Sequence, residues 1–161
     1  MSDQHYWFFL YNVNRENSQQ ALFIKDHPMA GETSLTTLLR SMSPQLNAGE
    51  FVFCTLSDGE LPSGLEVVGS FREQEGLTVI LERSHAERAG FSFDYVAAWI
   101  TLNVHSALEA VGLTAAFATA LGKAGISCNV IAGYYHDHLF VGQADAERAM
   151  QVLRDLAANA E

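Results

Sequence analysis

The sequence predicts an α+β protein with a mainly antiparallel sheet. Two pairs of strand-like runs are each joined by a short turn, which is how consecutive antiparallel strands are connected. The second half of the chain also has the order strand, helix, strand, strand, helix. In its first helix, apolar side chains between residues 113 and 124 recur three and four positions apart, which predicts a helix with one buried face.

Residues 1–28 differ in amino-acid composition from the rest of the chain. The aromatic patch YWFFLY is followed by the polar run NVNRENSQQ and then by ALFIKDHP, which ends at Pro28. The segment is expected to be either an N-terminal extension outside the core or a peripheral hairpin, and its sequence leaves both open. Met29 follows directly, and the compact fold is expected to begin there.

The remainder of the first half predicts a helix, three strands and a second helix. The first helix lies in MAGETSLTTLLRSM, with Thr33 or Ser34 as its N-cap. FVFCTL is a strand, SDGELPSG is a long loop, and VVGSFRE and LTVILE form a hairpin about residues 74–76. The segment SHAERAG predicts a short helix capped by Ser84 and ended by Gly90.

The second half begins with a strand at Val96–Val104 and continues through a loop to the helix LTAAFATALGKAG, which Gly125 ends. CNVIAGYY and HLFVG predict a hairpin about residues 136–137, and a helix capped by Asp145 closes the chain. We expect helical side chains to be buried against strand side chains, namely Leu113, Phe117, Leu121, Met150 and Leu153 against Ile100, Leu102, Val130 and Phe140.

An internal echo relates the two halves. VILERSHAERA (79–89) and LFVGQADAERA (139–149) share a strand, a turn and the start of a helix. Short matches of Ala, Glu and Arg are weak by themselves, because these residues are common in helices. The surrounding elements correspond as well, except that the first half has a Pro/Gly loop where the second has its long helix. The echo therefore suggests two related units.

Composition and charge exclude several kinds of partner. Nineteen acidic and nine basic side chains give a net charge of −10, which repels nucleic acid phosphates and an anionic membrane surface. The YWFFLY stretch is too short to span a bilayer and has no basic leader or small-residue cleavage site. Cys54 and Cys128 lie in apolar runs without ligand spacing, which indicates reduced core thiols. We therefore expect a cytoplasmic protein that binds neither nucleic acid nor membranes.

The motifs GxSxG, GxxxxGK[ST], GxGxxG after a strand and HExxH are all missing from the sequence, so neither an enzyme nor a cofactor is expected. The loop HSALE contains a histidine, a serine and a glutamate, but neighbours on one loop rarely reach the geometry of a catalytic triad. His136 and His138 are a possible metal pair, yet a metal site normally has three or four ligands. Turn chemistry explains the intervening Asp137.

The segments SLTTLLRSMSPQLN, EFVFCTL, SFREQEGLTVILE and residues 95–141 resemble the tandem ACT-like proteins, a family of small bacterial proteins similar to aspartate kinase regulatory modules and to cytosolic arginine sensors. VGLTAAFATALGKAGISCNV carries the resemblance most specifically. The resemblance implies a ferredoxin-like ACT sandwich with two ACT-like units side by side, at residues 29–93 and 94–161. Residues 1–28, the N-terminal extension, lie outside the resemblance.

The resemblance also implies a free amino acid as ligand, bound at the seam between units by the His105–Thr114 loop and the Cys128–Tyr134 strand. Helix-start amides suit the ligand's carboxylate, while carbonyls and acidic side chains suit its ammonium group. The expected ligand-binding residues on these segments and the following turn are Ser106, Glu109, Gly112, Leu113, Asn129, Tyr134 and Asp137.

Each of these residues also has a purely structural explanation. Gly112 is equally suited to start a helix, and Ser106 and Glu109 are ordinary loop residues. Asn129 interrupts an apolar strand, so its amide needs either backbone partners or a ligand.

The leading hypothesis is therefore an amino-acid-binding regulatory protein that forms a homo-oligomer, most simply a homodimer. A structural oligomerisation or protein-interaction module without ligand is the alternative, and an enzyme that uses the HDH turn is the third hypothesis.

Overall fold

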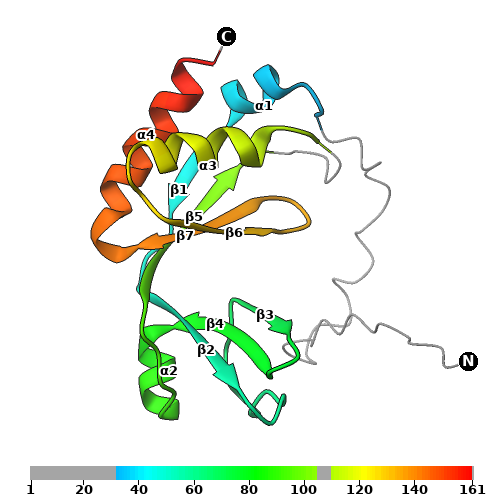
Figure 1. Cartoon of the computed structure of the whole chain (residues 1–161), viewed down its shortest axis with the longest axis vertical. Coiled ribbons are helices and arrows are strands. Elements are labelled where there is room, and N and C mark those ends of the chain that lie inside the picture. Colours follow the sequence, from blue (N-terminus) through cyan, green and yellow to red (C-terminus); the bar gives the residue numbers. More distant parts are fainter. Residues whose placement is uncertain (1–31, 105–109, 161) are drawn as a thin grey trace, which may run out of the picture.

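The computed structural model describes residues 32–104 and 110–160 (Figure 1). The helices are α1 (Leu35–Ser41), α2 (Arg83–Ala89), α3 (Leu113–Lys123) and α4 (Ala146–Ala158), with a short 3-10 turn η1 (Gln143–Asp145) before α4. The strands are β1 (Ser43–Leu46), β2 (Phe51–Leu56), β3 (Gly69–Arg72), β4 (Leu77–Glu82), β5 (Val96–Asn103), β6 (Cys128–Ala132) and β7 (Asp137–Gly142).

All seven described strands belong to one sheet, and every pairing between them is antiparallel. The order along the main path is β3-β4-β2-β5-β7-β6, and β1 pairs with β5 off this path. The prediction of an α+β protein with antiparallel sheet is thus confirmed.

Strand β5 joins the two halves of the sheet. On one side it pairs with β7 along most of its length. On the other side, its first residues Val96 and Ala97 pair with β2, and its later residues 100–103 pair with β1. The consecutive strands β1 and β2 therefore lie one after the other along the same side of β5. The sequence prediction missed β1, because a four-residue strand that contains Pro44 has no recognisable alternation.

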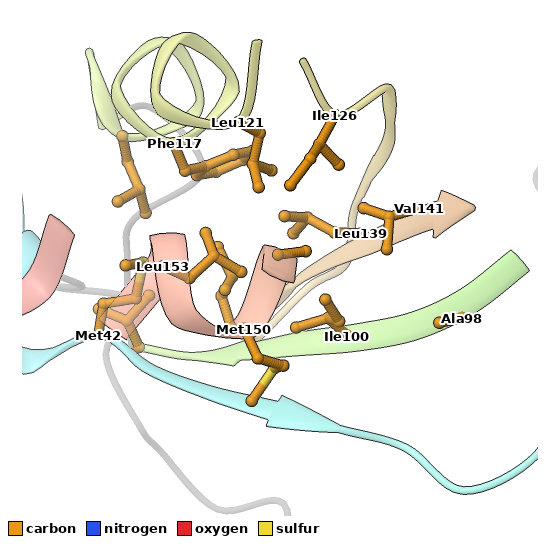
Figure 2. Packing of buried hydrophobic residues seen from close by; sticks show 14 of the residues in the cluster. Met42, Ala98, Ile100, Phe117, Leu121, Ile126, Leu139, Val141, Met150 and Leu153 are labelled. Atoms are coloured by element: carbon orange, nitrogen blue, oxygen red, sulfur yellow. The ribbon is translucent and has the colours of Figure 1, made fainter. Parts of the chain in front are cut away.

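Helices α1, α3 and α4 cover one face of β1, β5, β7 and β6 (Figure 1). Figure 2 shows the core between them, where Phe117 and Leu121 of α3 meet Leu153 of α4 above Ile100 and Leu139. All five of these side chains are fully buried. The predicted helical stripe is therefore confirmed as the buried face of α3.

One expected core contact is wrong. Phe140 is fully buried, but it packs on the sheet face opposite α3 and α4, in a cluster with Phe51, Ile80 and Ala97. Successive strand residues point to opposite faces, so Leu139 and Val141 face the helices and Phe140 cannot. Val130 is only half-buried against the helical core.

Helix α2 packs on β2 and β4 of the first half, on the same sheet face as the other helices. Val52, in the cluster that contains α2, is the register partner of Val96 on β5. Val96 points to the same sheet face as Ala98, two residues along the strand, and Ala98 belongs to the helical core with α4. The helix begins at Arg83, with Glu82 in the N-cap position, so the expected cap at Ser84 is wrong by two residues. Gly90 ends it in the left-handed conformation, as predicted.

The opposite sheet face is aromatic and has no helix on it in the described part of the chain. Phe51, Phe53, Trp99 and Phe140 make edge-to-face and stacked contacts there, with ring centroids 5.2 to 6.4 Å apart. The fold is thus a two-layer sandwich of helices on one side of a sheet.

The division into units at residues 29–93 and 94–161 stays a prediction. In space, Leu38, Leu39 and Met42 of the first segment lie in the same hydrophobic cluster as α3 and α4. The two similar segments of the sequence, 79–89 and 139–149, form equivalent elements, since β4 leads into α2 as β7 leads into α4. Segment 35–46 thus completes the helical core of the second half.

Candidate functional site

The end of β5 and the start of β7 lie side by side. Asp137, the first residue of β7, pairs with Leu102 of β5 on one side and with Ala132 of β6 on the other. The imidazole Nδ1 of His136 lies 3.4 Å from the carbonyl oxygen of Val104, where the loop toward α3 starts. The start of the predicted turn region thus lies beside Val104, the residue directly before the predicted loop, and the meeting of loop and turn stays a prediction. Ser106 and Glu109 lie outside the described residues.

Gly112 is the N-cap residue of α3 and has φ +104°, ψ −23°. This left-handed conformation favours glycine over any residue with a Cβ. The position is also crowded, because a Cβ on residue 112 would lie 3.0 Å from Cδ2 of Leu35 in α1. Gly112 has no side chain to accept hydrogen bonds from the backbone amides in the first turn of α3.

Leu113 follows Gly112 and its side chain is 2% exposed in the helical core. Only its backbone is therefore suited to contact a ligand.

Asp137 is a buried carboxylate without a cation beside it. Its side chain is 9% exposed and shares a sheet face with Leu139 and Val141, so it points toward the helical layer. Among the described residues it has no hydrogen bond or ion pair. Burial raises the pKa of Asp137, and the neighbouring His138 and His136 partly oppose this shift. A positively charged group in contact with Asp137 would relieve the cost of its burial.

Asn129 lies apart from these residues. It is the register partner of Phe140, and Ile131 two residues along β6 packs on the aromatic face. Asn129 therefore lies on the sheet face opposite Asp137. Its side-chain amide donates to the carbonyl oxygen of Phe140 at 3.5 Å, which agrees with the backbone explanation of this residue.

Tyr134 lies in the turn between β6 and β7, three residues before the predicted site residue Asp137. Its side chain is 57% exposed, and its ring packs edge-to-face on Tyr135 with centroids 4.8 Å apart. The turn thus presents two phenol rings at the surface, three residues or fewer from the buried carboxylate.

The sequence prediction missed a polar network on the aromatic face. The indole nitrogen of Trp99 donates to Nδ1 of His138 at 3.1 Å, and the Thr101 hydroxyl lies 3.3 Å from the same atom. Asn47, between β1 and β2, donates to the Thr101 hydroxyl at 2.9 Å. The alternation of Asp137 and His138 along one strand was the available signal, since it places them on opposite faces.

The described residues hold no cluster of three or more His, Cys, Asp or Glu side chains arranged to bind a metal. Two surface hollows were found elsewhere, one between α1, α3 and α4 beside Leu39, Val152 and Leu156, and one beside Arg83 of α2. Neither is lined by Asp137.

Two family models, both of the ACT domain, match the chain at residues 30–98 and 95–155. A solved structure from Vibrio cholerae is 53% identical, and the match covers 80% of this chain and 99% of that one with a TM-score of 0.69. This chain belongs to the ACT-domain family. The Vibrio cholerae protein is described as of unknown function and as a possible transport protein.

More distant solved structures share the fold. The ligand-free regulatory subunit of aspartate kinase from Thermus thermophilus is 9% identical, with coverage of 72% of this chain and 98% of that chain and a TM-score of 0.53. A protein from Agrobacterium tumefaciens is 19% identical, with coverage of 72% and 89% and a TM-score of 0.57. The predicted ferredoxin-like ACT sandwich is thereby confirmed, with two ACT matches in tandem.

No curated protein matches the sequence. None of the helices in residues 32–104 and 110–160 has the length and apolar character needed to cross a membrane.

Proposed function

We propose that this ACT protein is a non-catalytic regulatory protein of the cytoplasm that binds a free amino acid beside Asp137 and acts as a homodimer. The observation that carries the proposal is Asp137, which is 9% exposed, has no side-chain hydrogen bond or ion pair within residues 32–104 and 110–160, and lies on a strand paired with the end of β5. Membership of the ACT family and the shared fold of an aspartate kinase regulatory subunit support the regulatory role.

The carboxylate and ammonium groups of an amino acid match the start of α3 and the side chain of Asp137, respectively. The start of α3 offers backbone amides without a side-chain cap at Gly112, and such amides favour a carboxylate. Asp137 offers the opposite charge for an ammonium or guanidinium group. The bound amino acid would then lie between α3 and β7, with its carboxylate toward the helix.

A basic side chain on the ligand would strengthen this match. Asp137 is held at a cost while it is ionised and unpaired, because burial favours its neutral form. A second cationic group on the ligand, beyond the α-ammonium group, adds favourable interaction with the acidic chain as a whole, whose net charge is −10. We therefore expect lysine or arginine to bind more tightly than neutral amino acids.

A second surface is expected to complete the site. Neither of the two hollows described above is lined by Asp137, and we expect a second chain to contribute to the site. Among the described strands, β6 pairs only with β7 and lies at an edge of the sheet. A partner chain at this edge would cover the turn that carries Tyr134, which is why the proposal includes a homodimer.

The alternative function is an oligomerisation or interaction module without ligand. The same free edge of β6 favours it, since an edge strand can pair with another chain whether or not a ligand is present.

A thermal-shift and calorimetry screen of the free amino acids separates the two functions. A ligand at 100 times its Kd should stabilise the protein by about 2.7 kcal/mol. Asp137→Asn should remove the effect, and Glu82→Gln, at an exposed acidic position, should retain it. If no amino acid shifts the melting temperature, or if Asp137→Asn binds as the parent does, the ligand-binding proposal is wrong at this site.

A further inference from the structure

The two ACT repeats, matched at residues 30–98 and 95–155, share one strand register. In the first repeat, Arg72 of β3 pairs with Leu77 of β4. In the second, Ala132 of β6 pairs with Asp137 of β7, and the other pairs of the two hairpins keep the same shift along the sequence. Leu77 is therefore the residue of the first repeat that corresponds to Asp137.

The turns before these two residues are closed in the same way. The backbone amide of Glu73 donates to the carbonyl oxygen of Gly76 at 2.8 Å, and the amide of Gly133 donates to the carbonyl oxygen of His136 at 2.9 Å. Both hairpins thus have turns of equal length with the same closing hydrogen bond. The correspondence between the repeats holds through the turns as well as the strands.

The two corresponding residues lie at the same depth but differ in chemistry. Leu77 is 8% exposed and belongs to a hydrophobic cluster with Leu56 and Val79, whereas Asp137 is 9% exposed. Each begins its strand and points to the helical face of the sheet. A leucine is stabilised by such burial, while a carboxylate is destabilised unless it meets a cation or a hydrogen-bond donor.

The connection that follows the first strand also differs between the repeats. Residues 57–68 join β2 to β3 through turns and contain no helix, whereas α3 lies between β5 and β6 (Figure 1). Leu65 and Val67 of the 57–68 loop pack against the cluster that contains Leu77. The first repeat therefore covers this cluster with apolar side chains of its own loop.

Arg72 reinforces this cover. Its guanidinium group donates to the carbonyl oxygen of Gly59 in the loop at 3.2 Å, which ties the loop to β3. Because Arg72 is the pairing partner of Leu77, the first repeat has a cation at the position where the second has Ala132. A cation repels the ammonium group of an amino acid. The first repeat thus offers a ligand neither a buried carboxylate nor a helix start at these positions.

We propose that each chain binds one amino acid, in the second repeat, and that Leu77 and the 57–68 loop close the first repeat to a ligand. This stoichiometry rests on the proposed role of Asp137 and specifies how many such sites the chain has. A ligand in the first repeat would have to displace Leu65 and Val67 and bury its ammonium group among apolar side chains, and both steps are unfavourable.

Calorimetry of the full chain counts the sites, with the amino acid found in the screen as the probe. One ligand per chain is expected, and the methyl resonances of Leu65, Val67 and Leu77 should not move at saturation. Two ligands per chain, or methyl shifts there as large as those of Leu139, would overturn the proposal and leave the site at Asp137 standing. Binding that survives Asp137→Asn without such shifts would refute that site instead and support the closure of the first repeat.

A second readout needs no ligand. Leu77→Asp places a carboxylate at the closed position and should lower the melting temperature at pH 7 by about 5 °C or more. Leu61→Asp adds the same charge at a position of the loop that is 37% exposed, and should change it by about 2 °C or less. Equal melting temperatures for the two variants would overturn the proposal, whether or not an amino acid binds. If Leu77→Asp fails to fold, Leu77→Asn and Leu61→Asn give the same comparison with a neutral side chain.

Discussion

Leu35 lies over Gly112, with its Cδ2 atom 3.0 Å from the place where a Cβ on residue 112 would stand. The contact joins α1 to the start of α3, two elements that are far apart in the sequence. It also adds to the conformational reason for glycine, because residue 112 has φ +104°.

Gly112→Ala should therefore destabilise the protein by about 1–3 kcal/mol, from the left-handed backbone and the crowding together. Chemical denaturation measures this change. In the double variant with Leu35→Ala, the part due to crowding should be recovered while the backbone part remains. Gly122→Ala, within α3 and with open space for a Cβ, is the control and should have no such cost.

Asp137→Asn should raise stability at neutral pH while it weakens ligand binding. Folded Asp137 has a raised pKa, so between 3.8 and that pKa the folded state holds more protons than the unfolded state. The carboxylate therefore costs stability as the pH rises through this window, and the full cost persists above it. Urea unfolding of the parent and variant should coincide below pH 3.8 and separate above it, in favour of Asn. Equal stabilities at pH 7 would contradict the interpretation.

The loss of binding in the same variant should be large. A hydrogen bond to a charged group contributes about 1.5–3 kcal/mol, which corresponds to roughly 10- to 150-fold in Kd. Asn129→Ala, on the opposite face of the sheet, should leave Kd unchanged. Calorimetry with the amino acid found in the screen distinguishes the two positions, and a matching loss in both variants would place the ligand elsewhere.

Leu153→Ala should destabilise the protein by about 2–5 kcal/mol, because the side chain is fully buried between α4 and the sheet (Figure 2). Leu61→Ala is the matched control, since Leu61 is 37% exposed, and it should change stability by about 0.5 kcal/mol or less. Similar losses for the two variants, measured by urea unfolding, would contradict the packing described for α4.

The protein should sediment as a dimer at micromolar concentration, since β6 lies at an edge of the described sheet and can pair with a second chain. Analytical ultracentrifugation with and without the ligand measures this. A monomer at high micromolar concentration under both conditions would contradict the proposed assembly.

Periodicity was sufficient to predict the helices and strands that alternate clearly. Phe117 and Leu121 identified the buried face of α3, and the turn residues located the hairpin of β3 and β4. The second hairpin turns at residues 133–136, so the assignment of Asp137 to the turn is wrong, because Asp137 is the first paired residue of β7. Periodicity failed where a segment was too short to show a pattern, as in β1 at Ser43–Leu46. It also failed to assign the face of Phe140, which follows only from the register of β7 with β5.

For the candidate site, the family resemblance predicts Gly112 and Asp137 on neighbouring segments, and this stays a prediction. It could not show that Asn129 faces away from them, because that depends on the pleat of β6. The hydrogen bond between Trp99 and His138 was likewise beyond reach, since the two residues are 39 positions apart in the chain.

The passage of β1 directly into β2 along one side of β5 has a consequence for cooperativity. Residues 43–56 contribute backbone pairs to both halves of the sheet, so neither half retains its full set of strands without the other. A fragment that starts at residue 94 would lose α1 and β1 and expose Ile100, Leu102 and Leu153 to water. The two ACT repeats should therefore unfold in a single transition, with hydrogen-exchange protection in β4 and β7 lost together.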